Sequence, residues 1–213
     1  MLTRPLKGYQ SILWQIVFAC FFMLMLNITF QYIPYNSNVA FLQIKQSEVL
    51  AIPNYLFFFY LHVYTAIFCL LAGFTQFNAF ILKHFKKTHT YTGRLYVLVV
   101  LVAAAPSGFF IGCYANGGFY AKCAFLLLAT LWFFYTLKAL IEIKNGRVAS
   151  HKKFMLRSFA LTASALTLRL WKVILVYLFQ PAPMDVYQIV AWLGWVPNIL
   201  IIEFYLYKTQ FNE

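Results

Sequence analysis

The chain has 213 residues, of which 63% are hydrophobic and only 10% are charged, and its formal net charge is +12. A soluble domain carries about 25% charged residues and could not hide this much apolar side chain in one core, while a disordered chain is polar and poor in aromatic residues. A soluble nucleic-acid-binding protein is not expected either, because its positive charge lies on a largely polar surface. The composition therefore predicts an integral membrane protein.

Six segments of the chain are apolar enough to cross a membrane, which takes about 20 residues in a helix. Their apolar runs are continuous, without the alternating polar positions of barrel strands, so we expect an all-α bundle. In chain order, the predicted spans are Ser11–Tyr32, Leu56–Leu82, Leu95–Ala115, Phe119–Ile141, Phe154–Leu178 and Val186–Tyr207. Little chain remains for a soluble domain, so residues 1–213 are expected to form a single domain of six transmembrane helices.

The first predicted span follows two basic residues, Arg4 and Lys7, as the apolar core of a signal peptide does. It is longer than a typical signal core, and no small-residue cleavage site ends it. We therefore expect a retained membrane anchor.

The basic residues predict the orientation of the bundle. If the N-terminus is cytoplasmic, only four of the 17 Lys and Arg residues fall on the outer side: Lys45, Lys122, Arg169 and Lys172. The others gather on the inner side, as the positive-inside rule requires. Both termini are therefore expected to be cytoplasmic.

The connections between the spans differ in length and charge. Two short basic stretches, Lys83–Arg94 and Glu142–Lys153, are predicted inner loops, and the longest outer connection is Ile33–Tyr55. The middle of that connection, Val39–Leu50, mixes apolar and polar residues and is expected to form a short interfacial helix.

Four cysteines are present, and none of them forms a CxxC pair, so neither a zinc ribbon nor a thioredoxin-like motif is predicted. Cys20 and Cys69 lie inside spans and are expected to be packing residues. Cys113 and Cys123 flank the outer turn between the third and fourth spans. They form a disulfide if that face is oxidising, or stay as two free thiols, and the sequence leaves both outcomes open.

Prolines and polar residues interrupt the apolar runs. Pro106 and Pro197 can interrupt the helices of the third and sixth spans and free backbone carbonyls, although simple kinks are more common. Six polar residues at mid-depth are expected to form hydrogen bonds between helices: Gln76, Asn78, Thr162, Ser164, Thr167 and Asn198.

Among the ionisable residues of the predicted spans, His62 and Arg169 lie well inside the bilayer and are candidate functional residues, because such side chains are costly there. At 1.5 Å per residue, His62 lies about 9 Å and Arg169 roughly 14 Å below the outer boundary. If the second and fifth helices are neighbours, both side chains could face one cavity. Arg169 keeps its charge and needs an anionic ligand, a lipid headgroup or backbone carbonyls there, unless it extends outward to the interface.

A second pair of candidates repeats near the inner boundary. His89 precedes Arg94, and His151 precedes Arg157, each pair at the start of a predicted span. The repeat suggests two related hairpins. An arginine in the first turn of a helix lies against the helix dipole, so we expect an acidic partner, Glu142 or Glu203, or a phosphate.

Several of these segments together resemble a known family. They are His62 to Gln76, His89 with Gly93 to Tyr96, Ala105 to Gly108, His151 to Ser158, Ala160 to Thr162 and Thr167 to Arg169. In combination they are similar to a bacterial family of multi-pass membrane proteins known as domain of unknown function 2306. Thr90 stands where that family has a basic residue. The resemblance implies a polytopic protein of the bacterial inner membrane and brings no established activity. It points to the same six residues as candidate ligand contacts: His62, Arg169, His89, Arg94, His151 and Arg157.

Three functions agree with the sequence. We favour the binding or movement of a small amphiphile or lipid whose polar or anionic head meets these residues. The first alternative is a haem b or quinone-linked redox protein, although haem commonly takes two axial histidines at one level and His62 has no such partner. The second alternative is a non-catalytic accessory subunit of a membrane complex.

Catalysis is not expected, because the chain has no HExxH, GxSxG or P-loop motif. The interfacial histidines match no metal-ligand spacing. The expected partners are membrane lipids, an amphiphilic ligand, and another membrane protein or a second copy of the chain, but no nucleic acid.

Overall fold

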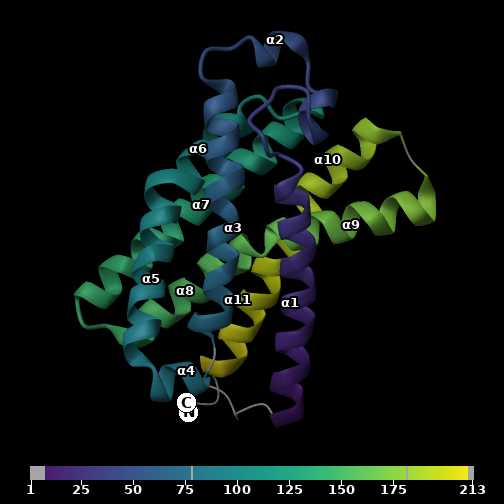
Figure 1. The fold of residues 1–213 in the computed structure, drawn as a ribbon. Coiled ribbons are helices and arrows are strands. Elements are labelled where there is room, and N and C mark those ends of the chain that lie inside the picture. Colours follow the sequence, from purple (N-terminus) through teal and green to yellow (C-terminus); the bar gives the residue numbers. More distant parts are fainter. Residues whose placement is uncertain (1–7, 78, 181, 211–213) are drawn as a thin grey trace.

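The computed structural model describes residues 8–77, 79–180 and 182–210, and within these ranges every regular element is helical (Figure 1). Arg4, Lys7 and Asn78 lie outside the described residues. The elements in chain order are α1 (Gly8–Phe30), the 3₁₀ turn η1 (Ala40–Ile44), α2 (Ser47–Leu50), α3 (Tyr55–Gln76), α4 (Ala79–His84), α5 (Lys86–Val99), the π-helical turn η2 (Val100–Ala104), α6 (Ala105–Gly112), α7 (Gly118–Lys144), α8 (Val148–Thr162), α9 (Ser164–Phe179), α10 (Pro183–Leu193) and α11 (Val196–Gln210).

Five helical segments in the described part of the chain are long and apolar enough to cross a membrane. They are Tyr55–Ala72, Lys86–Gly112, Gly118–Lys144, Val148–Phe179 and Met184–Thr209. They correspond to the second to sixth predicted spans. In α1 the apolar helical segment is Gln15–Phe30, which is shorter than these five. The first span therefore stays a prediction.

Three of the spans contain an interruption. Pro106 lacks an amide hydrogen, and the π-helical turn η2 lies immediately before it. Pro197 cannot donate to the carbonyl of Leu193, and α10 ends at that residue. Both spans are thus irregular near their proline, which the sequence allowed as the alternative to a simple kink. A further break at Ala163, between α8 and α9, carries no proline signal.

Two loop predictions need correction. Most of Lys83–Arg94 is helical, because α5 begins at Lys86 and only Phe85 interrupts the helix. The polar residues of this segment resemble a loop in composition but contain no helix breaker other than Gly93. At Gly93 an added Cβ would lie 2.9 Å from the Oε1 atom of Gln76, so the glycine permits α5 to pack closely on α3. In Val39–Leu50, two short turns, η1 and α2, replace the single interfacial helix.

In Figure 1, α1 and α3 stand side by side, the segment with η1 and α2 lies at one end of the bundle, and α4 lies at the other. The first described turns of α1 and the last of α11 lie at the α4 end. We name residues 31–54 the lid loop and its end of the bundle the lid end. Leu42, which belongs to this loop, is almost fully buried, so the loop packs as part of the fold.

A network of buried hydroxyl groups joins α5, α7 and α8 in the core. The Oη atom of Tyr96 lies 2.6 Å from the Oγ atom of Ser158 and 2.8 Å from the Oγ1 atom of Thr162, and it accepts a hydrogen bond from the indole of Trp132. The hydroxyl of Thr136 lies 2.7 Å from that of Ser158 and donates to the carbonyl of Trp132. Every hydroxyl of the network therefore has a partner.

Other polar residues also bond between helices, as predicted. The amide of Gln76 donates to the carbonyl of His89 and to the hydroxyl of Thr92, which joins α3 to α5. The amide of Asn198 donates to the carbonyl of Ala160 and to the hydroxyl of Thr167, which joins α11 to α8 and α9. The polar residues at mid-depth therefore hold together the segments on either side of the breaks.

We expect Thr136→Val to lower the free energy of unfolding by about 0.6–1.7 kcal/mol, because the change keeps the shape and removes one of the two hydroxyl partners of Ser158. Thr130→Val is the matched control. Thr130 lies on the same helix and donates to the carbonyl four residues earlier, as Thr136 does, but it is exposed. This control should change stability by less than about 0.5 kcal/mol. Equal losses for the two variants in detergent unfolding curves would contradict a stabilising role for the network.

Candidate functional site

A cavity of about 640 Å³ lies within the bundle toward the lid end. Its wall includes residues from α1, the lid loop, α3, α6, α7, α8, α9 and α10. Most of the lining side chains are apolar, among them Met25, Ile67, Leu70 and Leu128. A concave, mainly apolar site with a few polar groups is typical of small-molecule binding sites.

The charges on the cavity wall have one sign. Three cationic residues line it, namely Lys45, Arg169 and Lys172, and none of the described residues in the lining is Asp or Glu. In an apolar medium, an uncompensated cation is costly. The wall is therefore complementary to an anion.

Arg169 lies on α9, two turns beyond the break at Ala163. Its Nη1 atom donates to the carbonyl of Ala165 at 2.6 Å, and among the described residues it forms no other hydrogen bond and no ion pair. A guanidinium has five N–H donors and cannot lose its charge. Most of its hydrogen-bonding capacity is therefore left for a ligand or water.

His62 lies on α3 and packs against the π-helical turn and the helix after it. Its Nδ1 atom is 2.8 Å from the carbonyl oxygen of Ala104, the last residue of η2. A Cβ added at Gly108 would lie 2.9 Å from the Cε1 atom of the same ring. The glycine therefore makes room for the imidazole, and the carbonyl fixes its orientation.

The structure places His62 and Arg169 on the wall of the same cavity. From the depth of each residue along its helix, we expected that the two could face one cavity. Residues of α1, α3, α6, α8 and α9 line the cavity that they share. Their role in binding a ligand stays a prediction.

Lys45 belongs to the lid loop and was not singled out as a site residue from the sequence. Its Nζ atom donates to the carbonyl of Tyr114 and to the Oδ1 atom of Asn116, and it lies 5.7 Å from the centre of the Tyr55 ring. Burial, reinforced by the positive charge of Lys122, lowers the pKa of Lys45 to about 8. The only sequence signal was the apolar run around this lysine, which indicates a packed segment.

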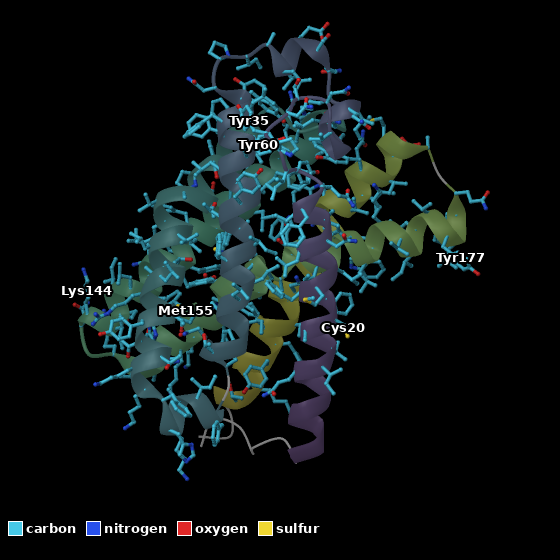
Figure 2. All side chains as sticks on the ribbon, in the orientation of Figure 1. Cys20, Tyr35, Tyr60, Lys144, Met155 and Tyr177 are labelled. Atoms are coloured by element: carbon cyan, nitrogen blue, oxygen red, sulfur yellow. The ribbon has the colours of Figure 1, made fainter. Side chains whose placement is uncertain are left out.

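Two tyrosines of α3 hold the lid loop in place. The Oη atom of Tyr60 accepts from the amide of Asn36 at 2.9 Å and donates to its carbonyl at 2.7 Å. The hydroxyl of Tyr64 donates to the carbonyl of Tyr32, which itself lines the cavity. In Figure 2, Tyr35 and Tyr60 lie together at the lid end, and their ring centres are 4.4 Å apart. The lid is therefore attached to the cavity wall at several points.

The deep end of the cavity is the buried hydroxyl network. Trp132 and Thr162 belong to both the network and the cavity wall. Sequence reasoning singled out Thr162, named Tyr96 and Ser158 only within segments that resemble the family, and missed Trp132 and Thr136. Their joint role depends on three helices meeting, and no spacing in the sequence indicates it.

The four candidates near the other end of the bundle are not part of the cavity wall. Arg157 pairs with Glu203 of α11, with N–O distances of 2.5 and 2.8 Å, so one of the predicted acidic partners is present. His151 lies 2.8 Å from the carbonyl of Ala139, and His89 bonds to the backbone of Thr75. His89 on α5 thus contacts α3, and His151 on α8 contacts α7, in each case the other long helix of the hairpin. This agrees with two related hairpins.

The remaining candidate, Arg94, is exposed and has no ion pair among the described residues. Glu142, the other acid considered for an inner arginine, pairs with Arg147 at 2.6 Å. The arginines near this end therefore differ, because Arg157 is neutralised by the fold and Arg94 is not. A ligand role for His89, Arg94, His151 and Arg157 stays a prediction.

Metal and thiol chemistry receive little support from the described residues. Among them, no three His, Cys, Asp or Glu side chains gather closely enough to hold a metal ion. His62 is the one histidine among the described cavity-lining residues, so a haem with two axial histidines does not fit this wall. Cys113 and Cys123 are free thiols.

The pKa of Lys45 predicts how stability depends on pH. Because this pKa is lower in the folded than in the unfolded chain, stability rises with pH from about 8 to about 10.4. Relative to Lys45→Met, the wild-type protein should therefore gain about 1–3 kcal/mol between about pH 7 and pH 10 in unfolding curves. Lys144→Met, which changes an exposed lysine far from the lid, should show no such trend. A constant difference between wild type and Lys45→Met across this range would contradict the prediction.

Comparison with known proteins places the chain in a family. Residues 59–206 match the family described as predicted membrane protein (DUF2306). The matched region includes His62, the π-helical turn and Arg169, and it begins after the lid loop. No curated protein and no solved structure matches the chain. Because the matched region covers well over half of its length, the chain belongs to the DUF2306 family of predicted membrane proteins.

Proposed function

We propose that this multi-pass membrane protein binds a small amphiphile with an anionic head in the cavity of its helix bundle, as a binding or transport protein. The observation that carries the proposal is the cavity wall, on which Lys45, Arg169 and Lys172 have no acidic neighbour among the described lining residues. The apolar walls suit a hydrocarbon tail, and the cations suit an anion.

Arg169 contributes the strongest argument for a ligand. A buried ion is stabilised only when its donors are satisfied, and its one hydrogen bond goes to the carbonyl of Ala165. The side chain of Lys172 is exposed and can place its charge in water by extending to the membrane interface. Arg169 is partly buried on the cavity wall, so this route accounts less well for its charge. An anionic head would meet the remaining donors.

We also propose that α1 completes a set of six spans, with both termini in the cytoplasm of a bacterial cell and the protein in the inner membrane. In support, the described ends of α1 and α11 lie at the α4 end of the bundle, where Lys83, Lys86 and Lys87 are exposed. The positive-inside rule would then put this end in the cytoplasm and the lid outside.

The proposed partners are membrane lipids and, as an alternative, a second copy of the chain or another membrane protein. The hairpin of α9 and α10 extends beyond the other helices, and Figure 2 shows Tyr177 near its tip. Tyr177 is 82% exposed, and Val173 and Phe179 beside it are also largely exposed. Lipid chains would cover this apolar face in the membrane.

The topology can be tested with single cysteines in a cysteine-free background. A membrane-impermeant maleimide should label Ser37→Cys, in the lid loop, in intact cells. Asn145→Cys, between α7 and α8, should react only after the membrane is opened. Thr3→Cys should behave like Asn145→Cys if six spans are present, and like Ser37→Cys if α1 does not cross the membrane. Labelling of Asn145→Cys in intact cells would overturn the orientation.

The anionic-ligand proposal predicts that Arg169→Met loses bound anionic lipid. A charge-assisted hydrogen bond contributes about 1.5–3 kcal/mol, so affinity should fall about tenfold or more. The measurement is mass spectrometry of lipids that co-purify with the protein in mild detergent.

Lys144→Met is the control, because it removes an exposed cation that lies away from the cavity and is not a candidate ligand contact. It should leave the lipid content unchanged. Wild-type lipid content in Arg169→Met, or equal loss in both variants, would contradict the proposal. A Soret band in the purified protein would point instead to haem.

A further inference from the structure

The hydrogen-bonding role of His62 can be assigned from its contact with Ala104. A carbonyl oxygen only accepts, so the Nδ1 atom at 2.8 Å carries the proton. In the neutral imidazole, the other nitrogen, Nε2, is then an acceptor. The π-helical turn thereby sets which of the two nitrogens offers a lone pair.

The Nε2 atom of His62 is open to a ligand. It makes no hydrogen bond to a described residue. In the described part of the chain, the fully buried side-chain atoms without a partner are the Nδ1 atom of His89 and the Nε1 atom of Trp195, and Nε2 of His62 is not among them. His62 lines the cavity, and Nε2 is its ring nitrogen without a partner among the described residues.

The cationic neighbours on the wall are not hydrogen-bonded to this acceptor. Arg169 and Lys172 carry N–H donors only, and the hydrogen bond that Arg169 makes to a described residue goes to the carbonyl of Ala165. An acceptor without a protein partner is stabilised by a ligand that brings a donor of its own.

We infer that the head of the ligand carries a hydroxyl group beside its anion, and that His62 accepts a hydrogen bond from this hydroxyl while Arg169 holds the anion. The inference rests on the proposed function. The chemical class with both groups on one amphiphile is a phospholipid whose phosphate bears a polyol, such as glycerol. A head with an ammonium group would supply a donor but would be repelled by the cations of the wall.

The matched probe lacks only the two hydroxyls of the head. Phosphatidylglycerol and phosphatidyl-1-propanol carry the same single negative charge, and with identical acyl chains they differ only in these hydroxyls. Binding of each to the purified full-length chain can be compared by titration with native mass spectrometry. We expect the wild type to bind phosphatidylglycerol about tenfold more tightly, the effect of one hydrogen bond to a desolvated acceptor.

Two variants separate the two recognition elements. His62→Phe should bind both lipids with the lower affinity, so the preference disappears while binding persists. His62→Gln keeps an acceptor and should keep part of the preference. Arg169→Met should weaken binding of both lipids and leave their ratio in place. A reduced ratio in Arg169→Met alone would overturn the assignment of the hydroxyl to His62.

The outcomes distinguish this inference from the proposed function. Equal affinity of the wild type for the two lipids would overturn the hydroxyl inference and leave the anionic-ligand proposal standing. No binding of either lipid, together with wild-type lipid content in Arg169→Met, would overturn the proposed function itself. Soluble glycerol 1-phosphate should not displace bound lipid, and displacement would assign the site to a free phosphate ester. Since the wild-type comparison needs no variant, poor folding of His62→Phe leaves the test intact.

Discussion

The main constraint on this bundle is the charge of Arg169. Its guanidinium cannot lose its proton, and it lies on the wall of an apolar cavity whose described residues include no carboxylate. Arg157 shows how an arginine can instead be neutralised within the fold, because it donates two hydrogen bonds to the carboxylate of Glu203. The chain therefore neutralises one arginine within the fold and leaves Arg169 with most of its donors unused. That contrast separates a structural ion pair from a site.

The two ends of the cavity are built by different means. At the lid end, a loop is folded over the cavity wall through Tyr60, Tyr64 and the buried amine of Lys45. At the deep end, the hydroxyls around Tyr96 satisfy one another and form a rigid floor. Hydrogen bonds between membrane helices contribute modestly, averaging about 0.6 kcal/mol each, so the floor acts mainly by fixing geometry. Access to the cavity would therefore depend more on the lid than on the floor.

Much of this arrangement follows from local sequence signals. Hydropathy indicates five spans that the structure contains. Pro106 and Pro197 mark two of the interruptions. Counting residues along each helix predicts similar depths for His62 and Arg169. These features depend on residues close together in the chain. The Arg157–Glu203 pair joins residues 46 positions apart, and Lys45 meets Asn116 across 71 positions. No periodicity encodes such contacts, which arise only when the helices pack. The helical structure of Lys83–Arg94 was missed for another reason. The polar, basic composition of this segment is typical of exposed chain, and exposed loops and exposed helices have similar compositions.

The π-helical turn η2 has a consequence for how the third span meets its neighbours. A π turn holds one residue more than an α turn, and one residue corresponds to about 100° of rotation. The helix after Ala104 is therefore turned relative to the helix before it. Tyr96 and Val100 pack in the core, while Gly108 and Gly112 face the cavity. The two halves of this span thus differ in phase by a fixed rotation, which lets one continuous helix turn α5 toward the core and present the glycine face of α6 to His62.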